Sequence, residues 1–109
     1  LLGLDKDPKA LEQGVSVLFT NMGRREAMYC IPQLRALREA GFRCEIYPDS
    51  AKLKKQFEYA NRCNIPVVIT AGESEMESGV FAVKQMADGR QEMVAGQDLV
   101  HYLQVLDLF

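Results

Sequence analysis

Three apolar runs, at residues 15–20, 42–47 and 65–71, are separated by segments in which apolar residues recur at helical spacing. The first and third runs are rich in β-branched residues and almost continuously apolar, which is typical of strands covered on both faces. The second run alternates apolar with polar residues, so we predict a strand at one side of the sheet with one exposed face. Three strands joined by two helical segments indicate right-handed βαβ units in a parallel sheet.

The segment between the first two runs predicts a helix that ends near Ala40. The residues at helical spacing are Ala27, Ile31, Leu34 and Arg38. Gly41 is placed to end this helix, because glycine readily adopts the left-handed conformation that follows many helix C-termini. Pro32 lacks the backbone donor that a helix interior uses, so we expect either a kink there or a regular helix that begins close to it.

The segment between the second and third runs predicts a lysine-rich amphipathic helix over residues 52–60, with its N-cap supplied by segment 48–50. On a wheel that advances ~100° per residue, one stripe is apolar and packs inward. That stripe consists of Leu53, Phe57 and Ala60. A neighbouring stripe is expected to face outward and consists of Lys52, Lys55, Gln56 and Tyr59.

The last part of the chain has a different pattern. Segments 80–86 and 91–95 flank a short connection that contains Asp88-Gly89, and an Asp-Gly pair between two strands is a strong hairpin signal. We therefore predict two antiparallel strands, followed by a closing helix over about residues 98–108. The predicted fold is a three-layer α/β/α domain in which a five-stranded mixed sheet is flanked by three helices.

Length and composition indicate one compact domain. The chain has 109 residues, of which 48% are hydrophobic, and this is enough for one core. Residues 1–13 carry several charges around Pro8 and begin without Met, so we expect a linker from a preceding domain of a larger protein, followed by a globular domain over residues 14–109. The net charge of −2 means that any nucleic-acid contact must come from a local patch.

The residue types that carry most enzyme chemistry are sparse. Cys30, Cys44 and Cys63 form no Cys-x-x-Cys pair, and an odd number of cysteines without a signal peptide is typical of reduced thiols in a cytoplasmic protein. The single histidine, His101, cannot complete a zinc site or a catalytic triad with them. No glycine-rich phosphate loop is present, and no apolar run approaches the ~18 residues of a membrane span. We expect no catalytic site and no metal in this domain.

Two local sequences are similar to those of a known family. These are the run Lys-Leu-Lys-Lys-Gln-Phe over residues 52–57, and a Gly-Glu-x-Glu turn over residues 72–75 that precedes the strand at 80–86. Together with the predicted order of strands and helices, the chain resembles the C-terminal anticodon-binding domain of class II aminoacyl-tRNA synthetases, and within that group it looks most like the histidyl enzymes. The resemblance covers about residues 15–109 and implies a domain that binds tRNA.

The resemblance implies site residues at one edge of the sheet. Lys52 matches a polar position that opens the second helix, Glu75 matches the acidic residue of the turn, and Lys84 matches a basic position of the following strand. A carboxylate can accept hydrogen bonds from base edges, whereas lysines hold phosphates. Tyr59 and Phe81 are candidates for stacking on unpaired bases. Phe81 shares a strand face with Val83, however, which favours a core position.

Further candidates follow from position alone. Lys55, Gln56 and Tyr59 share the predicted outward stripe with Lys52, so we include them among the residues that contact tRNA. Arg24 and Arg25 follow the first strand and are candidates for phosphate contacts. The alternative is that the lysine-rich face is solvated surface, which is the commoner role of such a face.

The resemblance also implies what lies outside this chain. The parent would be a cytoplasmic, homodimeric histidine–tRNA ligase in which a separate catalytic domain uses ATP and Mg²⁺, and its partner would be tRNA-His rather than DNA or a membrane. Three alternatives stay open: a threonyl, glycyl or prolyl enzyme, a non-enzymatic protein-interaction or regulatory module of the same fold, and a flavodoxin-like or receiver-like domain. The Asp-Gly hairpin argues against the last of these.

Overall fold

The computed structural model describes residues 15–48 and 50–106. The predicted linker at residues 1–13 and the last residues of the predicted closing helix lie outside the described residues.

Five strands form one mixed sheet in the order β2-β1-β3-β4-β5. They are β1 (Val17–Phe19), β2 (Cys44–Ile46), β3 (Val67–Thr70), β4 (Val80–Gln85) and β5 (Gln91–Ala95). β1 lies between β2 and β3 and is parallel to both, whereas β4 is antiparallel to β3 and to β5. The predicted mixed sheet is confirmed.

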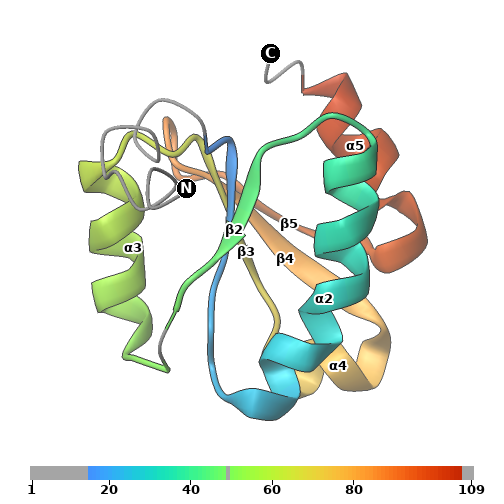
Figure 1. The fold of residues 1–109 in the computed structure, drawn as a ribbon, viewed down its shortest axis with the longest axis horizontal. Helices are drawn as coiled ribbons and strands as arrows, with labels where there is room; N and C mark the ends of the chain where they lie inside the picture. The colour runs from blue at the N-terminus through green and yellow to red at the C-terminus, as the bar shows by residue number, and fades with distance from the viewer. Residues whose placement is uncertain (1–14, 49, 107–109) are drawn as a thin grey trace, which may run out of the picture.

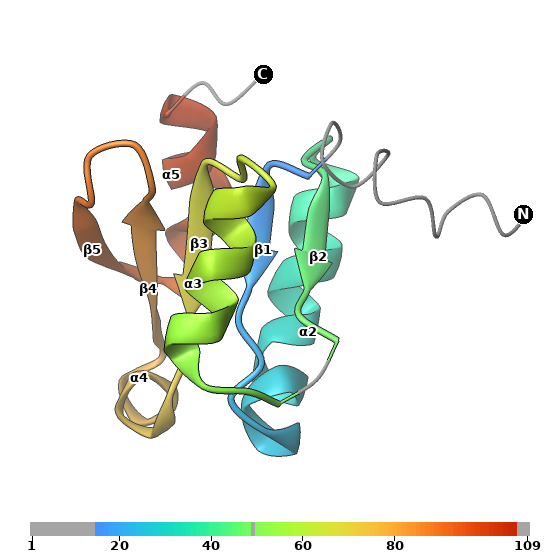
Figure 2. The same ribbon diagram turned by 90° about the vertical axis from the view of Figure 1, so that its left-hand side faces the viewer.

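Helices cover the two faces of this sheet unequally. They are α2 (Arg24–Glu39), α3 (Leu53–Arg62), α4 (Glu73–Ser78), the 3-10 turn η2 (Gly96–Asp98) and α5 (Leu99–Val105). Helix α3 lies on one face, and α2 and α5 lie on the other (Figure 1). Figure 2 shows that α3 lies in front of the parallel strands, while β4 and β5 are not covered by a helix on that face.

Two apolar clusters, one on each face, hold the layers together. On the α2 side, alternate strand residues such as Phe19, Ile69 and Phe81 pack against Leu37 of α2 and Leu103 of α5. On the α3 side, the intervening strand residues, including Leu18 and Val68, pack against Ala60 and Cys63. Both faces of the central strands are therefore buried, as the continuous apolar runs predict.

Three local features differ from the sequence predictions. The Gly-Glu-x-Glu segment forms the short helix α4 rather than a turn, because Glu75 caps its start and Gly79 ends it in the left-handed conformation at φ 72°. The described chain therefore has one helix more than predicted. Helix α2 is continuous through Pro32, which is exposed, so the helix does not begin there. The N-cap of α3 is Lys52 rather than a residue of segment 48–50, because the backbone is still extended at Lys52, at φ −62° and ψ 142°.

Candidate nucleic-acid interface

The uncovered side of β4 and β5 presents a lysine. Lys84 pairs with Val68 of β3, whose side chain is buried beneath α3, so Lys84 also points to the α3 side. Residues opposite each other in an antiparallel pair share a face, which adds Gln91 and Met93 of β5 to the same surface. Met93 is 53% exposed. We call this surface, formed by Lys84, Gln91 and Met93 beside α3 (Figure 2), the open face.

Lys84 is held over an aromatic ring at the border between the open face and α3. Its Nζ atom lies 4.7 Å from the centroid of the Phe57 ring, which is a cation–π contact. Phe57 was expected to be an inward residue of α3, but it is only half-buried. An ammonium beside a partly exposed ring can meet an RNA phosphate, while the ring can support an unstacked base.

The two flanks of α3 face different neighbours. Phe57 points toward β4, whereas Tyr59 packs edge-on against Tyr47, next to β2, at a centroid distance of 5.4 Å. Burial, followed by the neighbouring Cys63, raises the pKa of the Tyr59 hydroxyl. Arg62 also lies on the Tyr59 flank, 5.7 Å from its ring. The structure therefore separates Tyr59 from Lys84 by the width of the helix.

The lysines of α3 also lie on two different flanks of the helix. Lys52 and Lys55 fall on the Tyr59 flank by helical spacing, away from Lys84, whereas Lys54 falls on the Phe57 flank because it precedes Phe57 by three residues. Sequence reasoning left Lys54 out of the candidates. The i, i+3 spacing between Lys54 and Phe57 indicates that both lie on one flank of the helix. Only the contact between Phe57 and Lys84 shows that this flank adjoins the open face.

Gln56 faces inward, so the expectation that it faces outward is wrong. Its side chain is fully buried. Nε2 donates hydrogen bonds to the backbone oxygens of Asn21 at 2.9 Å and Ala51 at 2.8 Å, and Oε1 accepts one from the Asn21 amide at 2.7 Å. Asn21 in turn donates through Nδ2 to the Tyr47 carbonyl. Gln56 thus joins three segments at this end of the sheet and offers no surface to RNA.

Glu75 is engaged at the start of α4. Its Oε1 accepts a hydrogen bond of 2.7 Å from the Gly72 amide, and its Oε2 accepts one of 3.3 Å from the Ser74 hydroxyl. Glu75 also contributes to the raised pKa of Tyr29, an effect that comes first from burial and then from Cys30. Tyr29 belongs to α2, so these contacts place Glu75 with the α2 side, and no contact joins it to Lys84 among the residues that the structure describes.

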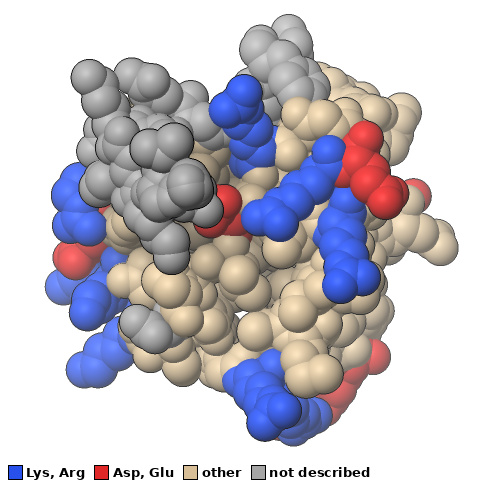
Figure 3. Space-filling view, viewed as in Figure 1, with Lys and Arg blue, Asp and Glu red and all other residues tan. Residues whose placement is uncertain are grey.

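Arg24 and Arg25 open α2 and are exposed. The starts of α2, α3 and α4 lie at one end of the sheet (Figure 1), so both arginines share that end with the first lysines of α3. Figure 3 shows lysine and arginine side chains over α3 and again at the start of α2. In the same view a further group of lysine and arginine side chains lies along α2 and near β2, and uncharged surface separates the groups (Figure 3).

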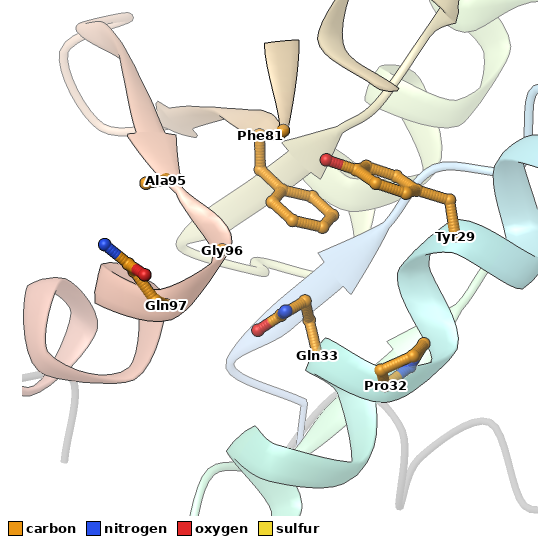
Figure 4. A pocket seen from close by; sticks show the side chains of 8 residues that line it. Tyr29, Pro32, Gln33, Phe81, Ala95, Gly96 and Gln97 are labelled. Carbon is orange, nitrogen blue, oxygen red and sulfur yellow. The ribbon is translucent and has the colours of Figure 1, made fainter. Parts of the chain in front are cut away.

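A hollow lies on the α2 side of the sheet, between α2, β4 and η2 (Figure 4). Its wall includes Phe81 and Tyr29, whose rings stack at 4.7 Å, and Gln33. Phe81 is 1% exposed, which confirms the core position favoured by the sequence pattern. None of its lining residues is a lysine or arginine, so the hollow offers no cation to a phosphate.

The cysteines among the described residues are buried and lie apart from the single histidine. Cys30 and Cys44 are buried, and burial raises the pKa of each thiol to about 12, so neither is a nucleophile at neutral pH. His101 is exposed on α5. Across residues 15–48 and 50–106 there is no cluster of three or more potential metal ligands, and no helix is long and apolar enough to cross a membrane.

The fold and the open face define an α/β binding domain with a cationic, partly aromatic surface. Residues 14–106 match the family model described as anticodon binding domain. The chain belongs to the anticodon-binding domain family.

Individual relatives and solved structures agree with this family. The chain is 47% identical over 97 residues to a histidine–tRNA ligase of Phocaeicola vulgatus and 43% identical over 97 residues to one of Bacteroides fragilis, and each match covers 89% of this chain. It spans about a fifth, 21%, of the length of these relatives. The histidyl-tRNA synthetase of Staphylococcus aureus matches 84% of this chain and 27% of its own with a TM-score of 0.74 at 27% identity. That of Nostoc, at 24% identity, shares the fold with a TM-score of 0.80, covering 84% of this chain and 22% of its own.

Proposed function

We propose that this chain is the anticodon-binding domain of a histidine–tRNA ligase, and that it binds the anticodon stem-loop of tRNA-His on the open face beside α3. The observation that carries the proposal is the contact between Lys84 and Phe57, which places a cation and a partly exposed ring together on an uncovered sheet surface. Single-stranded RNA is commonly bound by such a combination of stacking and phosphate contacts.

The identity of the tRNA is supported by the relatives. Relatives that match 86% to 89% of this chain carry the name histidine–tRNA ligase. We propose that the parent is a cytoplasmic homodimer, in which a catalytic domain outside this chain binds ATP and Mg²⁺ and joins histidine to tRNA-His. This domain then contributes binding energy and selection of the correct anticodon, without a cofactor of its own.

The site residues have separate roles in this proposal. Lys84, Phe57 and Lys54 form the part of the surface that meets the loop, and the first residues of α2 and α3, Arg24, Arg25 and Lys52, meet the phosphate backbone. Lys55 and Tyr59 lie on the other flank of α3 and contribute only if the RNA also reaches β2. Glu75 belongs to α4, which starts at the same end of the sheet as α3, so it reads a base edge of an RNA loop that extends from the open face past that end, through the lone pairs that its bonds to the Gly72 amide and the Ser74 hydroxyl leave free.

The test is a titration of the chain with the anticodon stem-loop of tRNA-His and with a stem-loop of different anticodon, followed by NMR at two salt concentrations. We expect selective shifts at Lys84, Phe57 and Lys54. Lys84→Ala should weaken binding of both loops by about fivefold to tenfold and reduce the salt dependence. Arg35→Ala, a loss of one positive charge on the exposed surface of α2, is the matched control and should leave the affinity unchanged.

Specificity is tested separately at Glu75. Glu75→Gln keeps an oxygen that can accept from the Gly72 amide, so α4 should remain capped, while the carboxylate is lost. We expect the preference for the cognate loop to shrink with little change in affinity for the other loop. Equal losses for both loops would remove Glu75 from base recognition, and shifts confined to the α2 side of the sheet would contradict the proposed surface.

A further inference from the structure

β5 forms one outer edge of the sheet, and it is the longer of the two edges. It has five residues, Gln91–Ala95, whereas the strand at the opposite edge, β2, has three. An edge strand carries a row of backbone groups that no neighbouring strand satisfies, and this row is a template for a further strand.

The hydrogen bonds of the hairpin show which residues carry these groups. The Gln85 amide donates to the Arg90 carbonyl at 2.8 Å, and the Gly96 amide donates to the Gly79 carbonyl at 3.3 Å. Arg90 and Gly96 therefore turn their backbone groups toward β4. Since the direction alternates along an antiparallel strand, Gln91 and Met93 turn theirs away from the sheet. Within the described part of the chain, neither residue has a backbone partner on that side.

A groove runs beside this edge, between β5 and α5. It has a volume of about 350 Å³, and its walls include Val94 of β5 and Tyr102 and Val105 of α5. The Tyr102 hydroxyl donates to Glu92 Oε1 at 2.7 Å, which fixes α5 against the strand. Val105 is 69% exposed and Met93 is 53% exposed, so the edge is bordered by apolar surface on both sides.

Most of the usual protections of an edge strand are missing from β5, and its one charged residue, Glu92, is hydrogen-bonded to Tyr102 of α5. Native proteins discourage pairing at an edge with proline, lysine, a bulge or a very short strand. β5 contains neither proline nor lysine, and its register with β4 continues through all five residues without a bulge. An edge of this kind, bordered by an apolar groove, has the features of a strand-addition site.

We propose that the free edge of β5 is a docking site for an extended, basic peptide segment of another protein, which adds a sixth strand to the sheet. The backbone of the segment would pair with Gln91 and Met93. Alternate side chains would enter the groove, with an apolar residue opposite Val94 and basic residues facing Glu92 and Asp98. This inference goes beyond tRNA binding and does not rest on it.

The acidic residues near β5 favour a basic peptide as the partner. Arg90 is already within 4.0 Å of Asp88, whereas the Asp98 carboxylate has neither a salt bridge nor a hydrogen bond among the described residues. A second copy of the chain fits less well. The one charged residue of β5 is Glu92, so a second copy would bring an acidic strand to this edge, and antiparallel self-pairing centred on Glu92 would set two Glu92 carboxylates opposite each other. Like charges that face each other across strands are destabilising.

The probe is the synthetic peptide acetyl-Thr-Lys-Thr-Val-Thr-Lys-Thr-amide, whose pattern is the same in either direction. We expect it to shift the NMR signals of Gln91, Met93 and Val105 in the whole chain. It should also slow hydrogen exchange of the Gln91 and Met93 amides at least fivefold, while the amides of Glu92 and Val94, already bonded to β4, change little. The peptide with Glu in place of Lys is the control and should bind at least tenfold more weakly.

Two variants separate docking from folding. Met93→Pro removes an amide that points away from β4, so the hairpin should remain intact while peptide binding falls at least tenfold. Val105→Asp places a charge at the groove and should have the same effect, whereas Gln104→Asp adds the same charge to an exposed position of α5 outside the groove and should have none.

Three results would overturn the proposal. The first is no shift at β5 at millimolar peptide. The second is binding that survives both Met93→Pro and Val105→Asp. The third is concentration-dependent shifts at β5 without peptide, together with a dimer in sedimentation, which would assign the edge to a second copy. A chain that binds the peptide but not the anticodon stem-loop would support this site and contradict the proposed function, so the two failures are distinguishable.

Discussion

At the scale of single residues, the described chain shows how similar polar side chains take opposite roles. Gln56 and Lys55 are neighbours in one helix, yet Gln56 is fully buried with three hydrogen bonds and Lys55 is exposed. A buried amide is tolerated only when its donors and acceptor are satisfied, and here the partners are backbone groups of Asn21 and Ala51. Gln56 therefore fixes the loop after β1 to the start of α3.

This role predicts a large effect of Gln56→Leu on stability. The substitution keeps the size of the side chain but leaves three backbone groups without partners in a buried place. We expect the free energy of unfolding to fall by about 3 kcal/mol, measured by urea denaturation. Lys55→Leu, one position away and exposed, is the control and should change it by less than about 0.5 kcal/mol. A loss below about 1 kcal/mol for Gln56→Leu would mean that water replaces the lost bonds.

At the scale of elements, the two flanks of α3 face different parts of the sheet. One flank, with Phe57, adjoins β4 and the open face, and the other, with Tyr59, adjoins Tyr47 beside β2. In the proposed RNA complex, a lysine of α3 would contribute according to its flank rather than according to its exposure. Lys54 and Lys55 are adjacent in sequence and both exposed, but they lie on different flanks.

The two lysines form a matched pair for a test. Lys54→Ala should weaken binding of the tRNA-His anticodon stem-loop about threefold to fivefold, because its side chain shares the flank with Lys84. Lys55→Ala should weaken it by less than twofold. Both variants remove the same charge from the same helix, so affinities measured at one salt concentration compare them directly. The reverse order would place the RNA on the β2 side of α3.

Much of this arrangement was predictable from sequence, for identifiable reasons. Continuous apolar runs predicted the buried strands, and Asp88-Gly89 predicted the hairpin, because periodicity and turn chemistry are local properties. The inward position of Gln56 was not predictable, since its partners lie up to 35 residues away. Helix α4 was missed because its six residues show no apolar stripe. The flank of α3 that adjoins the open face depends on strand order, which spacing alone does not give.

At the scale of the whole molecule, the α2 side of the sheet is a core that contains two buried thiols. Cys30 and Cys44 belong to this core, and burial raises the pKa of each from 9.0 to about 12. In the unfolded chain both thiols ionise near pH 9, while in the folded chain they keep their protons until much higher pH. Between these values the unfolded state binds fewer protons, so stability falls as the pH rises.

The expected decrease of the free energy of unfolding with rising pH can be measured. Each thiol should lower the free energy of unfolding by about 1.4 kcal/mol per pH unit once the pH is well above 9. Cys44→Ala should remove about half of the loss shared by the two thiols, and contributions from tyrosines cancel in the comparison with wild type. Urea denaturation between pH 8 and pH 10.5, under reducing conditions, provides the measurement. Parallel pH profiles for the two proteins would show that Cys44 ionises equally in both states.

The contact between Lys84 and Phe57 has a consequence for the thermodynamics of RNA binding. A free lysine side chain samples many rotamers, and confining it costs up to about 2 kcal/mol of conformational entropy. Here part of that confinement occurs when the protein folds, because the ammonium already rests over the ring. If RNA binds at Lys84 as proposed, the cation is preorganised and less entropy would be lost at the moment of association.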